Sequence, residues 1–129
     1  MEKKIHSVKM RSDESGATRS PIEGKAELFK YLSPLVLKSF GEYMLEHQTQ
    51  EDGQKREGDN WKKGADSKEW NDCLPDSKLR HFLDEWLIHD GYEKESRSDE
   101  VEALNAQLFG TMARLHNILD KKYRDKYKK

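Results

Sequence analysis

The stretch SDEVEALNAQLFGTMARLHNIL, residues 98–119, decides the fold. Its apolar residues recur at intervals of three and four, which is the repeat of an α-helix. Ser96 or Ser98 is expected to cap the start of this helix. The basic segment 121–129 suits its end, because cations stabilise the C-terminal end of the helix dipole. The apolar stripe comprises Val101, Leu104, Leu108, Thr111, Met112, Leu115, Ile118 and Leu119.

A second helix is predicted immediately upstream. The turn Pro75-Asp76-Ser77 is expected to open it, because proline fits the first position of a helix. Gly91 follows His89-Asp90 and is typical of a helix end. Apolar residues again fall at helical spacing: Leu79, Phe82, Leu83, Trp86 and Leu87.

A third helix is predicted from Pro34 to about Gln48, with Ser33 as its cap. A short helical or turn segment is expected over 26–32. Residues 49–74 read as a long polar connection, and a loop of this length is often functional. Trp61 and Trp70 either anchor this connection to the body or stack on a ligand.

Residues 1–24 contain Gly16, Pro21 and Gly24 among polar residues. We expect an irregular arm here, either disordered or lying over the body. Residues 25–129 are expected to form a single domain. No segment alternates β-branched and polar residues as a strand does. The predicted fold is therefore all-α, a small bundle of three main helices with an N-terminal arm and a long loop between the first two.

Composition bounds the class of protein. Only 33% of the 129 residues are hydrophobic and 38% are charged, so a lone chain buries little apolar surface and a dimer or tetramer is expected. The formal net charge is −1, which argues against binding a nucleic-acid polymer. Cys73 is the one cysteine, which suits a reducing cytoplasm. No run of about 20 apolar residues and no signal peptide is present, so we expect a cytoplasmic protein without membrane contact.

Candidate chemistry concentrates on the second helix. Asp84 and Glu85 lie three and four residues after His81 and so share a face of the helix with it, which makes the three residues candidate catalytic groups. Oxygen ligands suit Mg²⁺ or Mn²⁺. If the last two helices pack antiparallel, Glu102 approaches Asp84 and Glu85, and these three carboxylates are the predicted metal ligands. The alternative is a solvated face with ion pairs within the helix, together with simple capping of the last helix by its first-turn acids.

The arm offers cations beside glycines, in the order Gly16, Arg19, Gly24 and Lys25. Glycine lets backbone amides approach an anion, and basic side chains add charge-assisted hydrogen bonds. The alternative interpretation is a flexible tail with scattered charges and no ligand.

The motifs in order are GATRSPIEGK, the helix led by Ser33-Pro34, DNWKKG, LRHFLDEW and the final helix that begins near EAL. Together they resemble a phage and prophage family named for a dATP/dGTP diphosphohydrolase N-terminal domain. The resemblance runs from about Gly16 to Leu119. By position, the residues that match the family pattern are Arg19, Lys25, Asp59, Asn60, Trp61, Arg80 and His81.

The resemblance implies an all-α nucleotide-binding fold related to helical pyrophosphohydrolases, which use Mg²⁺ or Mn²⁺. As a first hypothesis, the protein hydrolyses a purine (deoxy)nucleoside triphosphate to the monophosphate and pyrophosphate. Arg19, Lys25 and Arg80 would bind phosphates, and Asn60 and Trp61 would bind the base or sugar.

Two other hypotheses stay open. Gly110 follows Phe109 where many family members carry an Asn, and a paired Glu-Glu motif is missing. A non-catalytic sponge that sequesters a nucleotide second messenger of host antiphage defence fits these departures. The third hypothesis is a protein-interaction role without any nucleotide.

Overall fold

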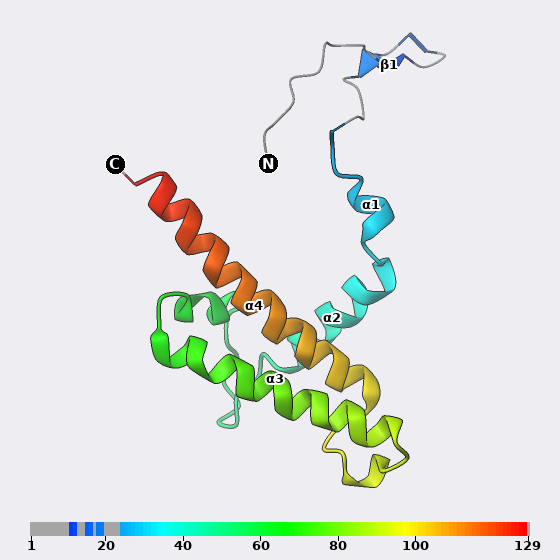
Figure 1. Cartoon of the computed structure of the whole chain (residues 1–129), viewed down its shortest axis with the longest axis vertical. Helices are drawn as coiled ribbons and strands as arrows, with labels where there is room; N and C mark the ends of the chain where they lie inside the picture. Colours follow the sequence, from blue (N-terminus) through cyan, green and yellow to red (C-terminus); the bar gives the residue numbers. More distant parts are fainter. Residues whose placement is uncertain (1–10, 13–14, 17, 20–23, 129) are drawn as a thin grey trace. The chain divides into compact units, whose positions relative to one another are not determined.

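The computed structural model describes residues 11–12, 15–16, 18–19 and 24–128. The fold is all-α, as predicted, with three main helices (Figure 1). Contacts divide the chain into two units, Met1–Pro34 and Leu35–Lys129. No helix in the described ranges is both long and apolar enough to cross a bilayer.

The first unit contains short elements only. Strand β1 (Arg11–Ser12) pairs antiparallel with β2 (Thr18–Arg19), and Gly16 between them has a φ of 82°. A ladder of two residues per strand is too short to leave a periodic signature in the sequence. Helix α1 (Leu28–Tyr31) lies within the short helical segment expected over 26–32.

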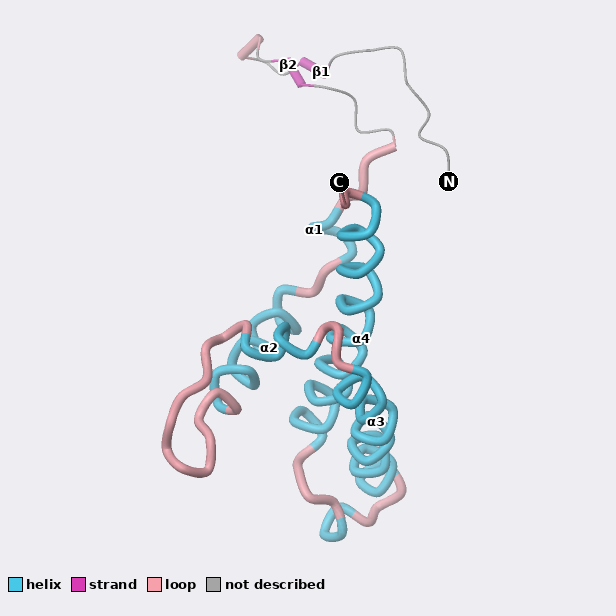
Figure 2. The backbone as a smooth tube through the Cα atoms, turned by 90° about the vertical axis from the view of Figure 1, so that its left-hand side faces the viewer, coloured by secondary structure: helices cyan, strands magenta, loops and turns pink. Residues whose placement is uncertain are grey.

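The second unit begins at Leu35, the second residue of α2 (Pro34–Glu46), and this helix ends close to the predicted Gln48. The loop between α2 and the 3-10 helix η1 (Asn60–Gly64) is drawn in pink in Figure 2. Part of the predicted polar connection is therefore regular, because η1 lies within it.

Helix α3 (Lys68–His89) begins earlier than predicted, and Pro75 lies inside it. The prediction that Pro75 opens this helix was therefore wrong. Ser67 is the actual cap, because its hydroxyl accepts a hydrogen bond from the Trp70 amide at 3.2 Å. Proline costs the helix one backbone hydrogen bond, and tertiary contacts offset that loss.

The amide side chain of Asn71 supplies such contacts for the first turns of α3. Its nitrogen donates to the carbonyl oxygens of Ala65 and Ser67, at 3.1 and 2.9 Å. Its oxygen accepts from Arg114 at 3.2 Å and from Asn117 at 3.0 Å. One side chain thus joins the preceding loop, α3 and the last helix.

Helix α3 ends at His89, and Gly91 follows with a φ of 88°, as expected of a helix stop. The 3-10 helix η2 (Glu93–Glu95) leads to α4 (Glu100–Lys126). The cap of α4 is Asp99, whose carboxylate accepts from the Glu102 amide at 2.8 Å. The prediction of Ser96 or Ser98 was wrong, since both serines hydrogen bond within the loop.

Helices α3 and α4 form an antiparallel hairpin and make the most extensive contact between elements (Figure 1). The residues of α4 that face α3 are small, and together we call them the inner seam: Ala103, Ala106, Gly110, Ala113 and Asn117, each buried. A Cβ placed on Gly110 would lie 2.6 Å from Cγ of Lys78. Small residues at heptad spacing thus let the two backbones approach closely.

The large apolar residues of α4 lie elsewhere. Val101, Leu104, Leu108, Leu115 and Ile118 are 40–61% exposed. With Thr111 they repeat at intervals of three and four, and we call these six residues the outer stripe. Leu79, Phe82 and Trp86 of α3 are likewise 44–63% exposed. The described core is therefore made mainly of small side chains.

Candidate functional site: a groove between α2 and η1

The second unit contains a groove of about 920 Å³. This volume lies at the upper end of the range of about 300–1,000 Å³ that is typical of small-molecule sites. The groove is bounded by the second half of α2, by the loop that follows it, by η1, and by Trp70 and Phe109 of the hairpin. The polar and aromatic residues that line it are Tyr43, His47, Gln48, Arg56, Glu57, Asn60, Trp61, Lys63, Ser67 and Trp70.

The loop after α2 is held in a hairpin shape, and this shape positions Arg56. Thr49 and Lys55 form an antiparallel bridge, and the Arg56 amide donates to the Gln48 carbonyl at 2.7 Å. The turn at its tip contains Gly53, with a φ of 82° that favours glycine. Backbone pairing thus brings Arg56 back to the end of α2, at the edge of the groove.

Trp61 connects η1 to the last helix. Its indole ring packs edge-on against Phe109 and His116, with centroids 5.8 and 5.0 Å apart. At the end of η1, a Cβ on Gly64 would lie 2.6 Å from the Trp70 ring, so the ring packs directly on the glycine. Both tryptophans therefore anchor the segment to the body, and both also line the groove.

The groove carries a local excess of positive charge. Arg56 and Lys63 line it, and neither has a carboxylate within ion-pair distance among the described residues. Lys62 lies over the Trp61 ring, with its Nζ 5.7 Å from the centroid. Glu57 is the acidic residue among those lining the groove. Unpaired cations beside aromatic rings suit an anion that carries a flat ring.

His47 and Tyr43 border the groove from the α2 side. Nδ1 of His47 lies 2.9 Å from the Tyr43 carbonyl, and Nε2 lies 3.5 Å from a Glu102 carboxylate oxygen. Burial, and then the negative charge of Glu102, raise the pKa of the Tyr43 hydroxyl. Tyr43 therefore stays protonated and can donate a hydrogen bond at neutral pH.

The predicted metal ligand Asp84 is buried and is occupied by Arg97. The guanidinium donates from Nη2 and Nε to Oδ2 at 2.7 and 3.0 Å, and the Arg97 amide donates to Oδ1 at 3.1 Å. These hydrogen bonds hold the pKa of the Asp84 carboxyl below its usual value, against the opposing effect of burial. The carboxylate thus fixes the loop before α4 to α3.

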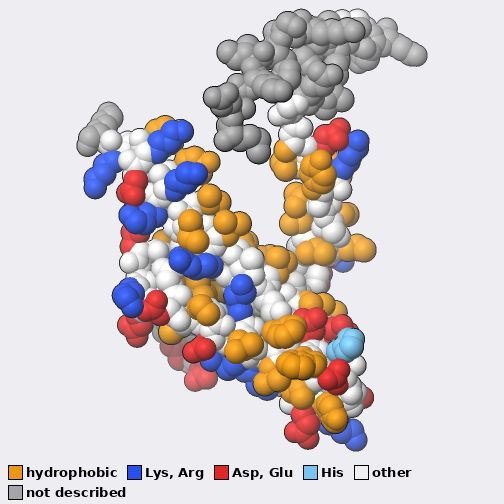
Figure 3. Space-filling model, in the orientation of Figure 1, with side chains coloured by type: hydrophobic (Ala, Val, Ile, Leu, Met, Phe, Trp, Pro, Cys, Tyr) orange, Lys and Arg blue, Asp and Glu red, His pale blue; other side chains and the backbone are white. Residues whose placement is uncertain are grey.

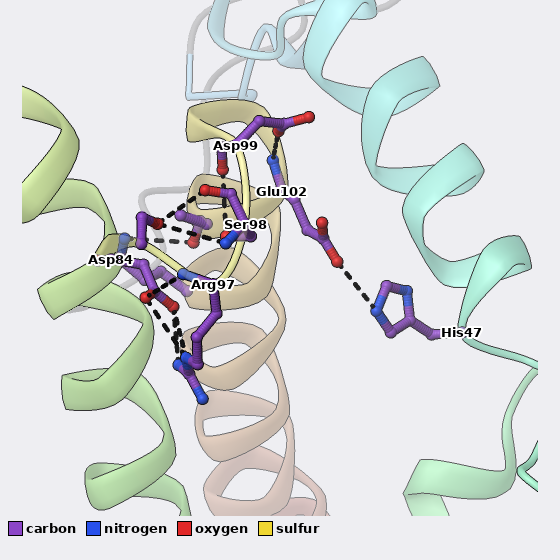
Figure 4. Close-up of polar contacts among 9 residues, drawn as sticks. His47, Asp84, Arg97, Ser98, Asp99 and Glu102 are labelled. Carbon is purple, nitrogen blue, oxygen red and sulfur yellow. Dashed lines mark hydrogen bonds and ion pairs between the residues drawn. The ribbon is translucent and has the colours of Figure 1, made fainter. Parts of the chain in front are cut away.

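The other two predicted ligands have different partners. Glu85 accepts a hydrogen bond from the side chain of Gln107 at 2.8 Å, and Glu102 lies against His47. Figure 4 shows Asp84 and Glu102 directed to separate partners, Arg97 and His47. Within the described ranges, no three His, Cys, Asp or Glu side chains gather in a way that could hold a metal ion.

The remaining predicted residues are dispersed. His81 is half-buried, and burial, followed by the charge of Arg97, lowers its pKa. Arg80 is exposed on α3, outside the groove. Asp59 precedes η1 and is exposed. Arg19 and Lys25 belong to the first unit. Of the predicted site residues, Asn60 and Trp61 line the groove together.

Sequence reasoning did not select the groove cations Arg56 and Lys63, or Tyr43 and His47. The turn at Asp52-Gly53 was visible in the sequence, and a hairpin there would have brought Arg56 back toward α2. Comparisons of the chain with protein-family models, curated proteins and solved structures found no match.

Proposed function

We propose that this protein binds a phosphate-bearing nucleotide in the groove between α2 and η1. The observation that carries the proposal is that two cations without acidic partners among the described residues, Arg56 and Lys63, line the same groove as the indole of Trp61. The resemblance to the phage diphosphohydrolase family independently supports a nucleotide as the ligand.

Each part of a nucleotide has a partner of suitable chemistry in the groove. Arg56 offers a planar fork of donors that matches phosphate oxygens, and Lys63 adds a point charge. The aromatic rings of Trp61 and Tyr43 offer apolar surface to a base. The amide of Asn60 can both donate to and accept from the polar edge of a base.

Binding without turnover fits the arrangement better than hydrolysis. Asp84, Glu85 and Glu102 are each engaged by another side chain, and none lines the groove. A sponge needs phosphate clamps and stacking but no convergent acids. In a phage protein, such a sponge would withdraw a nucleotide second messenger from host defence.

Metal-dependent hydrolysis of a purine nucleoside triphosphate is the second candidate. The observation that favours it is that the antiparallel packing of α3 and α4 places Asp84, near the end of α3, and Glu102, near the start of α4, at the same end of the hairpin. Mg²⁺ or Mn²⁺ at these carboxylates would neutralise phosphate charge and assist formation of hydroxide.

The deciding experiment is incubation of the full chain with deoxynucleoside triphosphates and cyclic dinucleotides, with Mn²⁺ or with EDTA. Both the products and the nucleotide retained by the protein are analysed. Intact nucleotide recovered in EDTA, without products, is the expected result. Release of pyrophosphate that requires Mn²⁺ would replace sequestration by hydrolysis, and no retained nucleotide and no product across the panel would refute both.

Arg56→Ala tests the location of the site. Loss of a charge-assisted phosphate contact should weaken binding by about 10- to 100-fold in Kd, measured by calorimetry. Lys55→Ala is the matched control, since Lys55 precedes Arg56 on the same hairpin and does not line the groove. Arg80→Ala should resemble this control. If Arg80→Ala abolishes binding and Arg56→Ala does not, the nucleotide binds on α3 instead.

A further inference from the structure

The outer stripe of α4 is a regular apolar surface that no element of the second unit covers. Its members Val101, Leu104, Leu108, Thr111, Leu115 and Ile118 repeat at alternating intervals of three and four residues. The apolar members are 40–61% exposed. This heptad spacing is the pattern of a helix that packs against another helix along its length.

The outer stripe lies nearly opposite the inner seam. At 3.6 residues per turn, positions two residues apart differ by about 160° around the helix, and every stripe position except Ile118 lies two residues before a seam position. Helix α2 contacts a third face, where Ser39 accepts a hydrogen bond from Asn105 at 2.9 Å. The hairpin partner and α2 thus leave the outer stripe free.

Helix α3 extends this surface. A shallow groove between the helices is lined by Leu79 and Phe82 of α3 and by Gln107 and Arg114 of α4. Gln107 and Arg114 lie on α4 between the inner seam and the outer stripe, so this groove borders the outer stripe on its α3 side. Figure 3 shows hydrophobic side chains over the C-terminal half of α3 and along α4.

We infer that this face binds a second copy of the chain, with the two α4 helices antiparallel. The intervals along the outer stripe are the same from either end of the helix. The apolar residues of two antiparallel copies can therefore lie opposite one another. Val101 then lies opposite Ile118 of the other copy, and Leu104 lies opposite Leu115. Two hairpins joined in this way make a four-helix bundle around a twofold axis.

The charges beside the outer stripe also favour the antiparallel orientation. Glu100 flanks its start and Lys121 flanks its end, at equivalent positions of the heptad. Lys121 is paired with Asp125 at 3.0 Å, but both side chains are more than half exposed, so this pair is weak and exchangeable. In an antiparallel dimer each Glu100 faces Lys121 of the other copy, whereas in a parallel dimer these equivalent heptad positions lie on opposite sides of the interface and the two charges do not meet.

The apolar area is sufficient for a stable dimer. Full burial of one large apolar side chain removes on the order of 100 Å² from water. The apolar members of the outer stripe, with Leu79, Phe82 and Trp86, are about half exposed. They supply roughly 400 Å² per copy. A standard interface buries about 800 Å² per partner, of which a little over half is apolar.

The test measures the mass of the full chain by sedimentation equilibrium from about 1 to about 100 µM, which brackets a micromolar dissociation constant. A dimer is expected. Leu108→Glu places a charge at the centre of the interface and should raise the dissociation constant at least about 100-fold. Leu37→Glu is the matched control, because Leu37 is 57% exposed on α2, outside this face. It should leave the dimer intact.

Charge exchange tests the orientation. Glu100→Lys should weaken the dimer by about 10-fold, because the contact occurs twice, and Lys121→Glu added in the same chain should restore it. Circular dichroism checks that each variant stays helical. A monomeric wild-type chain, including one whose own residues 1–34 cover the face, would overturn the inference. So would a dimer that tolerates Leu108→Glu, and failure of the double variant to recover would overturn the antiparallel arrangement.

Discussion

The inner seam and the outer stripe lie on the same helix, α4. Their residues repeat with the same spacing but differ in side-chain size. The inner seam is built of alanine, glycine and asparagine and is buried, whereas the outer stripe is built of leucine, isoleucine and valine and is largely exposed. Small side chains let α3 approach closely, so packing inside the chain comes from proximity of the backbones. Large side chains carry most of the hydrophobic free energy, and here they remain available for contact between molecules.

The largest effect should come from enlarging the inner seam. Gly110→Leu places four carbon atoms where a single Cβ already lies 2.6 Å from Lys78 Cγ. The Lys78 side chain or the helices themselves must shift to make room, and the free energy of unfolding should fall by about 3 kcal/mol in urea denaturation. An unchanged midpoint would show that the hairpin is not closely packed at this point.

A somewhat smaller loss is expected where the loop before α4 joins α3. Asp84→Ala removes the buried carboxylate that accepts from the Arg97 side chain and backbone. The stability should fall by about 2 kcal/mol, less than for a fully buried pair, because the Arg97 side chain is 57% exposed and regains water. Asn at position 84 should retain part of this stability, since its oxygen still accepts from the Arg97 amide.

The same pair predicts a pH dependence. The pKa of Asp84 is lowered in the folded chain, so its stabilisation is complete above the unfolded value of about 3.9 and is lost as the pH falls through the lower folded value. Acid unfolding should therefore be less steep in Asp84→Ala than in the wild type. Equal slopes, followed by fluorescence, would mean that Arg97 does not hold this carboxylate in solution.

Thr111→Leu tests the outer stripe of α4, as Gly110→Leu tests the inner seam. It fills the one polar position of the outer stripe, which is next to Gly110 in sequence but is exposed, about 100° further around the helix. We expect little change in unfolding of the monomer and a dissociation constant about 10-fold lower for the dimer, from the added apolar contact. A loss of stability like that of Gly110→Leu would assign Thr111 to the packed side.

The smallest effect concerns His81, which is half-buried on α3. Burial, and then Arg97, lower its pKa, so its contribution is complete above about 6.5 and is lost as the pH falls through the folded value. NMR titration should place this imidazole below 6.5, and Arg97→Gln should move it upward. A titration at or above 6.5 in the wild type would exclude the proposed environment.

The helices were predictable because periodicity and end signals are local properties of the chain. The end of α3 before Gly91 and the start of α2 at Pro34 were found in this way. The start of α3 was not, because Pro75 is tolerated only through contacts of Asn71 with residues far away in sequence. Periodicity also does not reveal which face of α4 packs against α3, since alanine and glycine are weak apolar signals.

The candidate site was predictable only in part. Asn60 and Trp61 were selected from the motif around them, and both line the groove. Asp84, Glu85 and Glu102 were grouped by spacing on their helices, but spacing does not reveal a partner such as Arg97 in a loop. Arg56 lies at the groove because the backbone pairs across a turn, and the type of one residue does not reveal such pairing.

Pro75 divides α3 into two parts that are expected to differ in how readily they unfold locally. Because proline has no amide proton, the carbonyl of Asn71 receives no helical hydrogen bond at this point. Residues before Pro75 are stabilised by the Ser67 cap and by the hydrogen bonds of the Asn71 side chain. Those after it pack against α4 in the α3/α4 hairpin. Amide exchange should therefore be faster in Lys68–Leu74 than in the rest of α3. Since Trp70 lies in this first part and lines the groove, the groove can change shape while the hairpin stays folded.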